Sequence, residues 1–179
     1  LTDVTLYFSD VRDFTSYAEA HRPERVVELL NRLISIQVSV IDRYGGDVDK
    51  IIGDAVLAVF TGSERAAKAI ACAKEVLTQC AKLQDLPRKL AIGVHDGVVV
   101  AGAIGAADRQ DYTVIGDAVN VSQRLCTLAE ANQLVSDVHT LQRAGHPDGF
   151  GGVEDQTVKG RQEALRVRRW GATATVEAV

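Results

Sequence analysis

The chain has 179 residues, of which 46% are hydrophobic and 25% charged, and its formal net charge is −4. This size and balance are typical of one soluble globular domain with a sizeable core. The slightly acidic balance argues against non-specific binding to nucleic acid, so local cations or metal ions would have to hold a polyanionic substrate. No apolar run reaches the length of about 18 residues that spans a bilayer, and we expect no membrane contact by this segment.

The three cysteines, Cys72, Cys80 and Cys126, include no Cys-x-x-Cys pair. Two of them lie in an alanine-rich helical pattern, where a free cysteine behaves as a small buried hydrophobe. An odd number without a metal-binding spacing favours a reducing, cytoplasmic setting. No secretory signal pattern is present, and the chain begins almost inside its first predicted strand. We therefore expect a module of a larger multidomain protein.

The predicted elements follow the order strand, helix, two strands, helix, strand, with later additions. Strands are expected at 4–9, 47–52, 55–60, 89–94, 98–104, 112–115, 133–136, 152–158 and 163–170. Helices are expected just after Asp10 and at 23–44, 64–83, 117–131 and 137–144. Gly53-Asp54 marks a tight hairpin, Ser63 is expected to cap the helix at 64–83, and residues 95–97 are expected to form a turn.

This order matches the α+β class, with a ferredoxin-like βαββαβ core that carries C-terminal additions. In this topology the helices are expected on one face of the sheet. We expect residues 1–170 to form a single domain and residues 171–179 to be a frayed tail.

Two aspartates, Asp10 and Asp54, each end a short apolar run, and the predicted topology brings their strands together. Mg²⁺ is usually held by one or two carboxylates together with the phosphates of the substrate. The carbonyl of Val11 could add an oxygen ligand, and the first amides of the next helix, near Phe14 and Thr15, could hold phosphate oxygens. A helix-capping role for Asp10 is an open alternative.

Lys50 stands inside an otherwise apolar strand pair, four residues before the Asp54 turn. Such a lysine commonly snorkels or pairs with a carboxylate, here Asp49, but it could instead donate to a purine ring atom. Asn120 and Arg124 are four apart and therefore share one helix face. An arginine fork can clamp phosphate oxygens and stabilise charge in a transition state, although a solvated polar stripe is the alternative.

A last weak signal is Lys159 beside Gly160, a pairing that suits phosphate contact. Three longer motifs occur in a fixed order: a Phe-x-Asp block with Phe-Thr at 8–15, a Lys-x-x-Gly-Asp hairpin at 50–54, and a Gly-Asp-x-Val-Asn-x-x-x-Arg helix at 116–124. In order and wording they resemble the catalytic domain of the class III nucleotidyl cyclases, which include the adenylyl and guanylyl cyclases. The resemblance covers about residues 3–170.

The resemblance implies an adenylate cyclase, which converts ATP to 3′,5′-cyclic AMP and pyrophosphate. Asp10, Val11 and Asp54 would bind two Mg²⁺ or Mn²⁺ ions, one activating the ribose 3′-hydroxyl and one holding the triphosphate. The 3′-oxygen would then attack the α-phosphorus in line. The remaining roles would be ribose orientation, stabilisation of the α-phosphate and binding of the terminal phosphates, by Asn120, Arg124 and Lys159 respectively.

The resemblance also implies that Lys50 and Thr113 read the base. A lysine donor suits N1 of adenine and clashes with the N1–H of guanine, so ATP is the expected substrate. Threonine at this position resembles a subgroup of adenylyl cyclases that bicarbonate often stimulates. The family works as a head-to-tail dimer, and we expect a symmetric homodimer. One protomer would give the aspartates and the other would give Lys50, Thr113, Asn120, Arg124 and Lys159.

Three alternatives remain open from the sequence: a catalytically silent cyclase-homology module that regulates or binds nucleotide, a guanylate cyclase, and a diguanylate cyclase. Gly45-Gly46-Asp47 superficially resembles the diguanylate cyclase signature, but Val48-Asp49 follows it where that family has Glu-Phe. Two positions depart from the class III pattern. Asp13 stands where glycine is usual, and Ala91 replaces an arginine that some members carry near the phosphates.

Overall fold

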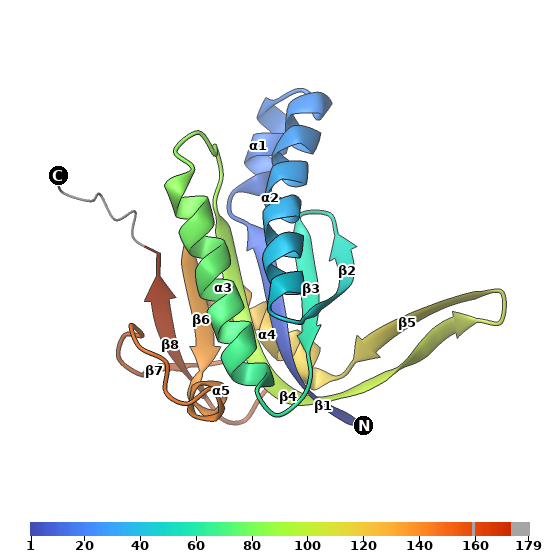
Figure 1. Ribbon diagram of the computed structural model, residues 1–179, viewed down its shortest axis with the longest axis vertical. Coiled ribbons are helices and arrows are strands. Elements are labelled where there is room, and N and C mark those ends of the chain that lie inside the picture. The colour runs from blue at the N-terminus through green and yellow to red at the C-terminus, as the bar shows by residue number, and fades with distance from the viewer. Residues whose placement is uncertain (159, 173–179) are drawn as a thin grey trace.

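The computed structural model describes residues 1–158 and 160–172, which build one mixed sheet with helices packed on both of its faces (Figure 1). The strands are β1 (Thr2–Val11), β2 (Asp47–Ile52), β3 (Ala55–Phe60), β4 (Leu90–Ala106), β5 (Arg109–Ile115), β6 (Gln133–Asp137), β7 (Glu154–Gln156) and β8 (Leu165–Gly171). The helices are α1 (Phe14–Ala20), α2 (Pro23–Arg43), α3 (Arg65–Lys82), α4 (Asp117–Leu128) and α5 (Val138–Arg143). Throughout the described part of the chain, every helix is too short or too polar to cross a bilayer.

Strand β1 is an inner strand of the sheet, whose strand order is β2-β3-β1-β4-β6-β8-β7, with β5 paired to β4 outside this path. It pairs antiparallel with β3 on one side and with β4 on the other. The order β2-β3-β1-β4 contains two split βαβ units, because β3 lies between β1 and β2, and β1 lies between β3 and β4. Strand β6 adds beside β4 and runs parallel to it. The predicted βαββαβ core with C-terminal additions is confirmed.

The sheet is buried on both faces, which corrects the expectation that the helices lie on one face. On one face, Tyr7 and Val11 of β1 pack with α2 and α3. On the other, Val4, Leu6 and Phe8 pack with α4 (Figure 1). Successive side chains of a strand point to opposite faces, so helices on a single face would leave these three apolar side chains in water.

Strand β4 runs unbroken through residues 95–97, so the predicted turn there is wrong. The backbone of His95 pairs with that of Leu6, and the backbone of Gly97 pairs with that of Val4. Asp96 between them is buried but compensated, because its carboxylate accepts hydrogen bonds from Thr5 at 2.6 Å and Arg65 at 2.8 Å. A buried charge is tolerated when it is paired and hydrogen-bonded in this way.

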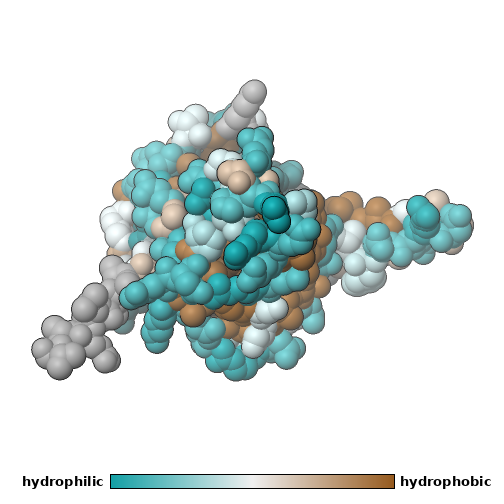
Figure 2. All heavy atoms as spheres, turned by 90° about the horizontal axis from the view of Figure 1, so that it is seen from above, coloured by the Kyte–Doolittle hydropathy of each residue, from teal (hydrophilic) through white to brown (hydrophobic). Residues whose placement is uncertain are grey.

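The outer half of β4 pairs with β5 alone, and the two strands form an arm that projects from the body of the domain (Figures 1 and 2). Several apolar side chains on or beside this arm are exposed. They are Val98, Val100, Ile104, Tyr112 and Ile115, with Tyr112 75% exposed. The exposed apolar area marks the arm as a surface that can bind another molecule.

Several predicted boundaries shift. Helix α3 begins at Arg65 with Glu64 at the N-cap position and no side-chain cap, so the predicted Ser63 cap is wrong. The backbone N–H of Arg65 bonds the carbonyl of Gly62, and Ser63 lies inside that turn. Helix α4 ends at Leu128, three residues before the predicted end at 131. Strand β8 extends to Gly171, while residues 173–179 of the expected tail lie outside the described residues.

The close approach of β4 to α4 gives a stability prediction. A Cβ at Gly93 would lie 2.4 Å from both the backbone N of Cys126 and the backbone O of Ser122, which are helix atoms that cannot rotate away. We expect Gly93→Ala to lower the free energy of unfolding in urea by about 3 kcal/mol. Gly102→Ala, in the same strand but with no heavy atom within 4 Å of the added Cβ, is the matched control. Equal stabilities of the two variants would contradict this packing.

Candidate active site

The two aspartates meet where β1 and the β2–β3 turn lie side by side. Asp10 is the penultimate residue of β1, and Asp54 sits in the turn, with φ +58° at the preceding Gly53 allowing its tight geometry. The backbone N–H of Val11 donates to Oδ2 of Asp54 at 2.9 Å. The sequence-based expectation that the topology brings these residues together is confirmed.

Asp10 does not cap a helix, so the alternative role is wrong. Helix α1 begins at Phe14, and its N-cap residue is Asp13 in the left-handed region at φ 56°. Oδ1 of Asp10 is instead buried and has no hydrogen-bond partner among the described residues. Its nearest compensating charge is Nη2 of Arg12, 3.4 Å away.

The environment of Asp10 favours a bound cation. Burial raises the pKa of its carboxyl, Arg12 lowers it, and the nearby Asp54 raises it again, so the pKa is raised overall. Two neighbouring carboxylates, one with a buried oxygen that accepts no hydrogen bond from the described residues, form an arrangement that a divalent cation would stabilise. The described residues therefore fit the implied metal ions.

An open hollow of about 540 Å³ surrounds these two carboxylates. Its lining includes the five residues that were predicted to bind the metal ions and the phosphates, which are Asp10, Val11, Phe14, Thr15 and Asp54. The remaining lining residues come from α1 and its N-cap, and are Asp13, Ser16 and Glu19. Within residues 1–158 and 160–172, no group of three or more His, Cys, Asp or Glu side chains is placed to hold a metal ion. Asp13, the departure from the class III pattern, adds a carboxylate to this lining.

A second hollow, of about 450 Å³, lies between β2 and the arm. It brings together the two predicted base-reading residues, Lys50 and Thr113, with Asp49 between them. Oγ1 of Thr113 donates to Oδ2 of Asp49 at 2.8 Å, and Nζ of Lys50 lies 3.4 Å from the same oxygen. Sequence reasoning treated Asp49 only as a partner of Lys50 and missed its bond to Thr113, because only the fold brings the arm beside β2.

Asn120 and Arg124 lie on α4 and line neither of these hollows. Asn120 is exposed and Arg124 half-buried, and neither side chain forms a hydrogen bond or ion pair within the described part of the chain. Lys159 lies outside the described residues. Close to it in sequence, Arg161 pairs with Asp117 in the first turn of α4.

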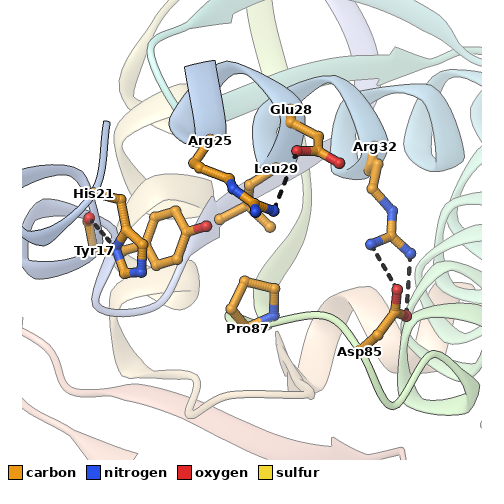
Figure 3. Close-up of a pocket in the computed structure, with 8 residues that line it drawn as sticks. All are labelled: Tyr17, His21, Arg25, Glu28, Leu29, Arg32, Asp85 and Pro87. Atoms are coloured by element: carbon orange, nitrogen blue, oxygen red, sulfur yellow. Dashed lines mark hydrogen bonds and ion pairs between the residues drawn. The ribbon is translucent and has the colours of Figure 1, made fainter. Parts of the chain in front are cut away.

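A third hollow, of about 570 Å³, lies among α1, α2 and the loop before β4, with two aromatic rings stacked at one end (Figure 3). Its two arginines are each paired with a carboxylate, Arg25 with Glu28 at 3.8 Å and Arg32 with Asp85 at 3.1 Å. Because these charges compensate one another, this hollow offers no excess charge to a phosphate or a cation.

Among the curated relatives that this chain matches are two named as adenylate cyclases. It is 34% identical to an adenylate cyclase of Anabaena cylindrica, over 92% of this chain and 36% of that protein. It is 31% identical to the terminal-differentiation specific adenylate cyclase of Dictyostelium discoideum, over 92% of this chain and 8% of that protein. The chain therefore spans a minor part of the length of these relatives.

Solved structures of both nucleotide specificities share the fold. The adenylyl cyclase CyaB from P. aeruginosa superposes with a TM-score of 0.84 at 26% identity, covering 97% of this chain and 95% of that chain. The guanylyl cyclase Cya2 superposes with a TM-score of 0.81 at 29% identity, covering 98% and 95%. The sequence profile of the adenylate and guanylate cyclase catalytic domain matches residues 1–166. With this match over most of its length, the chain belongs to the adenylate and guanylate cyclase catalytic domain family, the class III nucleotidyl cyclases.

Proposed function

We propose that this domain converts ATP to 3′,5′-cyclic AMP and pyrophosphate, at sites shared by two copies of the chain. The main observation behind the proposal is that the candidate metal ligands and the candidate base-reading residues line two separate hollows. The hollow with Asp10 and Asp54 shares no lining residue with the hollow that contains Lys50 and Thr113. Within one copy, neither hollow offers both a metal site and a base site, so a second copy would have to complete each.

Asp10 and Asp54, with the carbonyl of Val11, would hold two Mg²⁺ or Mn²⁺ ions. When bound, the ions would neutralise the triphosphate and make the ribose 3′-hydroxyl more acidic. The hydrogen bond from Val11 N–H to Asp54 fixes the orientation of that carboxylate before any ligand arrives. Phe14 and Thr15, which line the same hollow, would contact the phosphates.

The other copy would supply the groups that act on ribose and phosphate. Arg124 would stabilise the charge on the α-phosphate, and Asn120, one turn earlier on α4, would orient the ribose. Asn120 is exposed and Arg124 half-buried, so both side chains are accessible to a substrate, which supports this role. Lys159 would bind the terminal phosphates.

A head-to-tail homodimer is supported by the projecting arm. A lone domain would leave the apolar side chains of the arm in water, and burial against a second copy would remove that cost. The arm also carries Thr113, so its docking surface and the proposed base site are continuous. A symmetric pair would contain two equivalent sites.

ATP is the proposed substrate because Lys50 offers donors to the base, which suit N1 of adenine. An assay for the products cyclic AMP and cyclic GMP would separate this proposal from its two alternatives. A catalytically silent module would form neither cyclic nucleotide, and a guanylate cyclase would form cyclic GMP. Stimulation by bicarbonate rests on Thr113 alone and stays a prediction.

We propose a cytoplasmic location within a larger multidomain protein. The three free cysteines support a reducing compartment. All three are buried, and burial raises the pKa of the Cys72 thiol to about 12, which makes it unreactive.

The shared site predicts complementation between inactive variants. Asp54→Ala and Arg124→Ala should each abolish formation of cyclic AMP from Mn²⁺-ATP, because each removes a group needed at both sites. Mixed in equal amounts, they should recover about a quarter of wild-type activity, since half of the dimers are mixed and each mixed dimer has one intact site. Two preparations of Asp54→Ala mixed together are the control. Failure of the mixture to recover activity, although mixed dimers form, would exclude the shared site.

If Asp10 and Asp54 bind metal, Mn²⁺ should stabilise the folded protein in the absence of nucleotide, and this stabilisation should depend on pH. At 100 times the dissociation constant, a ligand of the folded state adds about 2.7 kcal/mol, so the Tm should rise by several degrees. Mn²⁺ needs the ionised carboxylate, and the pKa of Asp10 is raised. The Tm shift should therefore disappear, as the pH falls, at a higher pH than for an ordinary aspartate site.

Asp10→Asn should abolish this Tm shift at neutral pH, whereas Asp3→Asn, at an exposed position of the same strand, should keep it. Differential scanning fluorimetry of the nucleotide-free protein measures both. An undiminished shift in Asp10→Asn would place the metal elsewhere.

A further inference from the structure

Asp49 is a buried carboxylate that the proposed mechanism does not use. Its side chain is only 8% exposed, and it lies between the two base-reading residues. A single oxygen, Oδ2, accepts the hydrogen bond from Thr113 at 2.8 Å and faces Nζ of Lys50 at 3.4 Å. The carboxylate therefore links a side chain of β2 to one of the arm.

An irregularity in β2 accounts for this placement. The register against β3 shifts between Val48 and Lys50, as in a β-bulge. In a regular strand Asp49 and Lys50 would point to opposite faces, but a bulge re-aims one side chain. Both residues consequently line one hollow, together with Thr113.

The bonding pattern fixes what the hollow offers to a ligand. An ionised carboxylate can only accept hydrogen bonds, so the hydroxyl hydrogen of Thr113 is committed to Asp49. The lone pairs of Oγ1 remain free, and Thr113 presents an acceptor. The ammonium group of Lys50 has three N–H donors, and one directed at Asp49 leaves two for the ligand.

We propose that Asp49 is a positioning residue that sets the base specificity of this cyclase, by holding Thr113 as an acceptor beside Lys50 as a donor. This inference rests on the proposed function. Adenine presents a donor at its 6-amino group and an acceptor at N1, which complement this pair. Guanine presents the reverse, an acceptor at O6 and a donor at N1, and would leave both contacts mismatched.

Asp49→Asn tests the inference with almost no change of shape. The amide can donate to Oγ1 of Thr113, which frees the hydroxyl hydrogen to point toward O6 of guanine, and Lys50 loses its anionic partner. We expect kcat/KM for ATP to fall about tenfold and its ratio to kcat/KM for GTP to fall by at least the same factor. The melting temperature measures whether the fold is retained.

Two further variants make the test specific. Asp47→Asn removes an exposed carboxylate from the same strand and should leave the ATP-to-GTP ratio unchanged. Thr113→Val removes the proposed acceptor and should lower the ratio as Asp49→Asn does. In the double variant the two losses should not add, because both act through one oxygen. If Asp49→Asn fails to fold, Thr113→Val still shows whether Oγ1 of Thr113 discriminates between ATP and GTP.

Binding of 3′-deoxy-ATP and 3′-deoxy-GTP, which lack the reacting hydroxyl, gives a readout independent of turnover. Asp49→Asn should reduce the preference for the adenine analogue about tenfold. If the wild type forms cyclic AMP and Asp49→Asn keeps the wild-type ratio, the role of Asp49 is overturned and the proposed function stands. If the wild type binds but cyclises neither nucleotide, the proposed function fails, and the binding preference still decides the role of Asp49.

Discussion

The antiparallel pairing of β1 with β3 is the constraint on which the candidate site depends. It brings the end of β1 to the β2–β3 turn, where the amide of Val11 binds the carboxylate of Asp54. The two aspartates are 44 positions apart in sequence, and this register makes them neighbours. A slip of one residue would turn the apolar side chains of β1 to the wrong faces, so the packing of both cores enforces the geometry of the carboxylates.

Much of the fold could be predicted from local sequence patterns, because the turns and helix ends concerned depend mainly on residues that are adjacent in sequence. The strands on either side of Gly53-Asp54 have the predicted bounds of 47–52 and 55–60, since a glycine turn between apolar runs specifies a hairpin without further help. The long helix α2 likewise begins at its predicted proline and ends one residue before the predicted position. In these segments local preference and tertiary packing agree.

The sequence-based predictions were wrong where tertiary contacts outweigh local conformational preference. His95-Asp96-Gly97 has the composition of a turn, yet pairing with β1 and two basic partners for Asp96 keep β4 extended. In the candidate site, the predicted strand topology was enough to place Asp10 and Asp54 together. The bond between Asp49 and Thr113 could not be predicted, because it depends on a register irregularity in β2 and on where the arm lies.

The tight contact at Gly93 has a mechanical consequence. At Gly93 the backbone of β4 packs directly against the backbone of α4, with no space for a side chain between them. The backbone of Asn120 and Arg124, on the same helix, is therefore held close to the sheet of its own copy. In the proposed shared site, a rotation of one subunit against its neighbour would therefore carry both residues together, relative to the aspartates of the other copy. Such a rotation would change the geometry of the shared site without repacking the interior of either subunit.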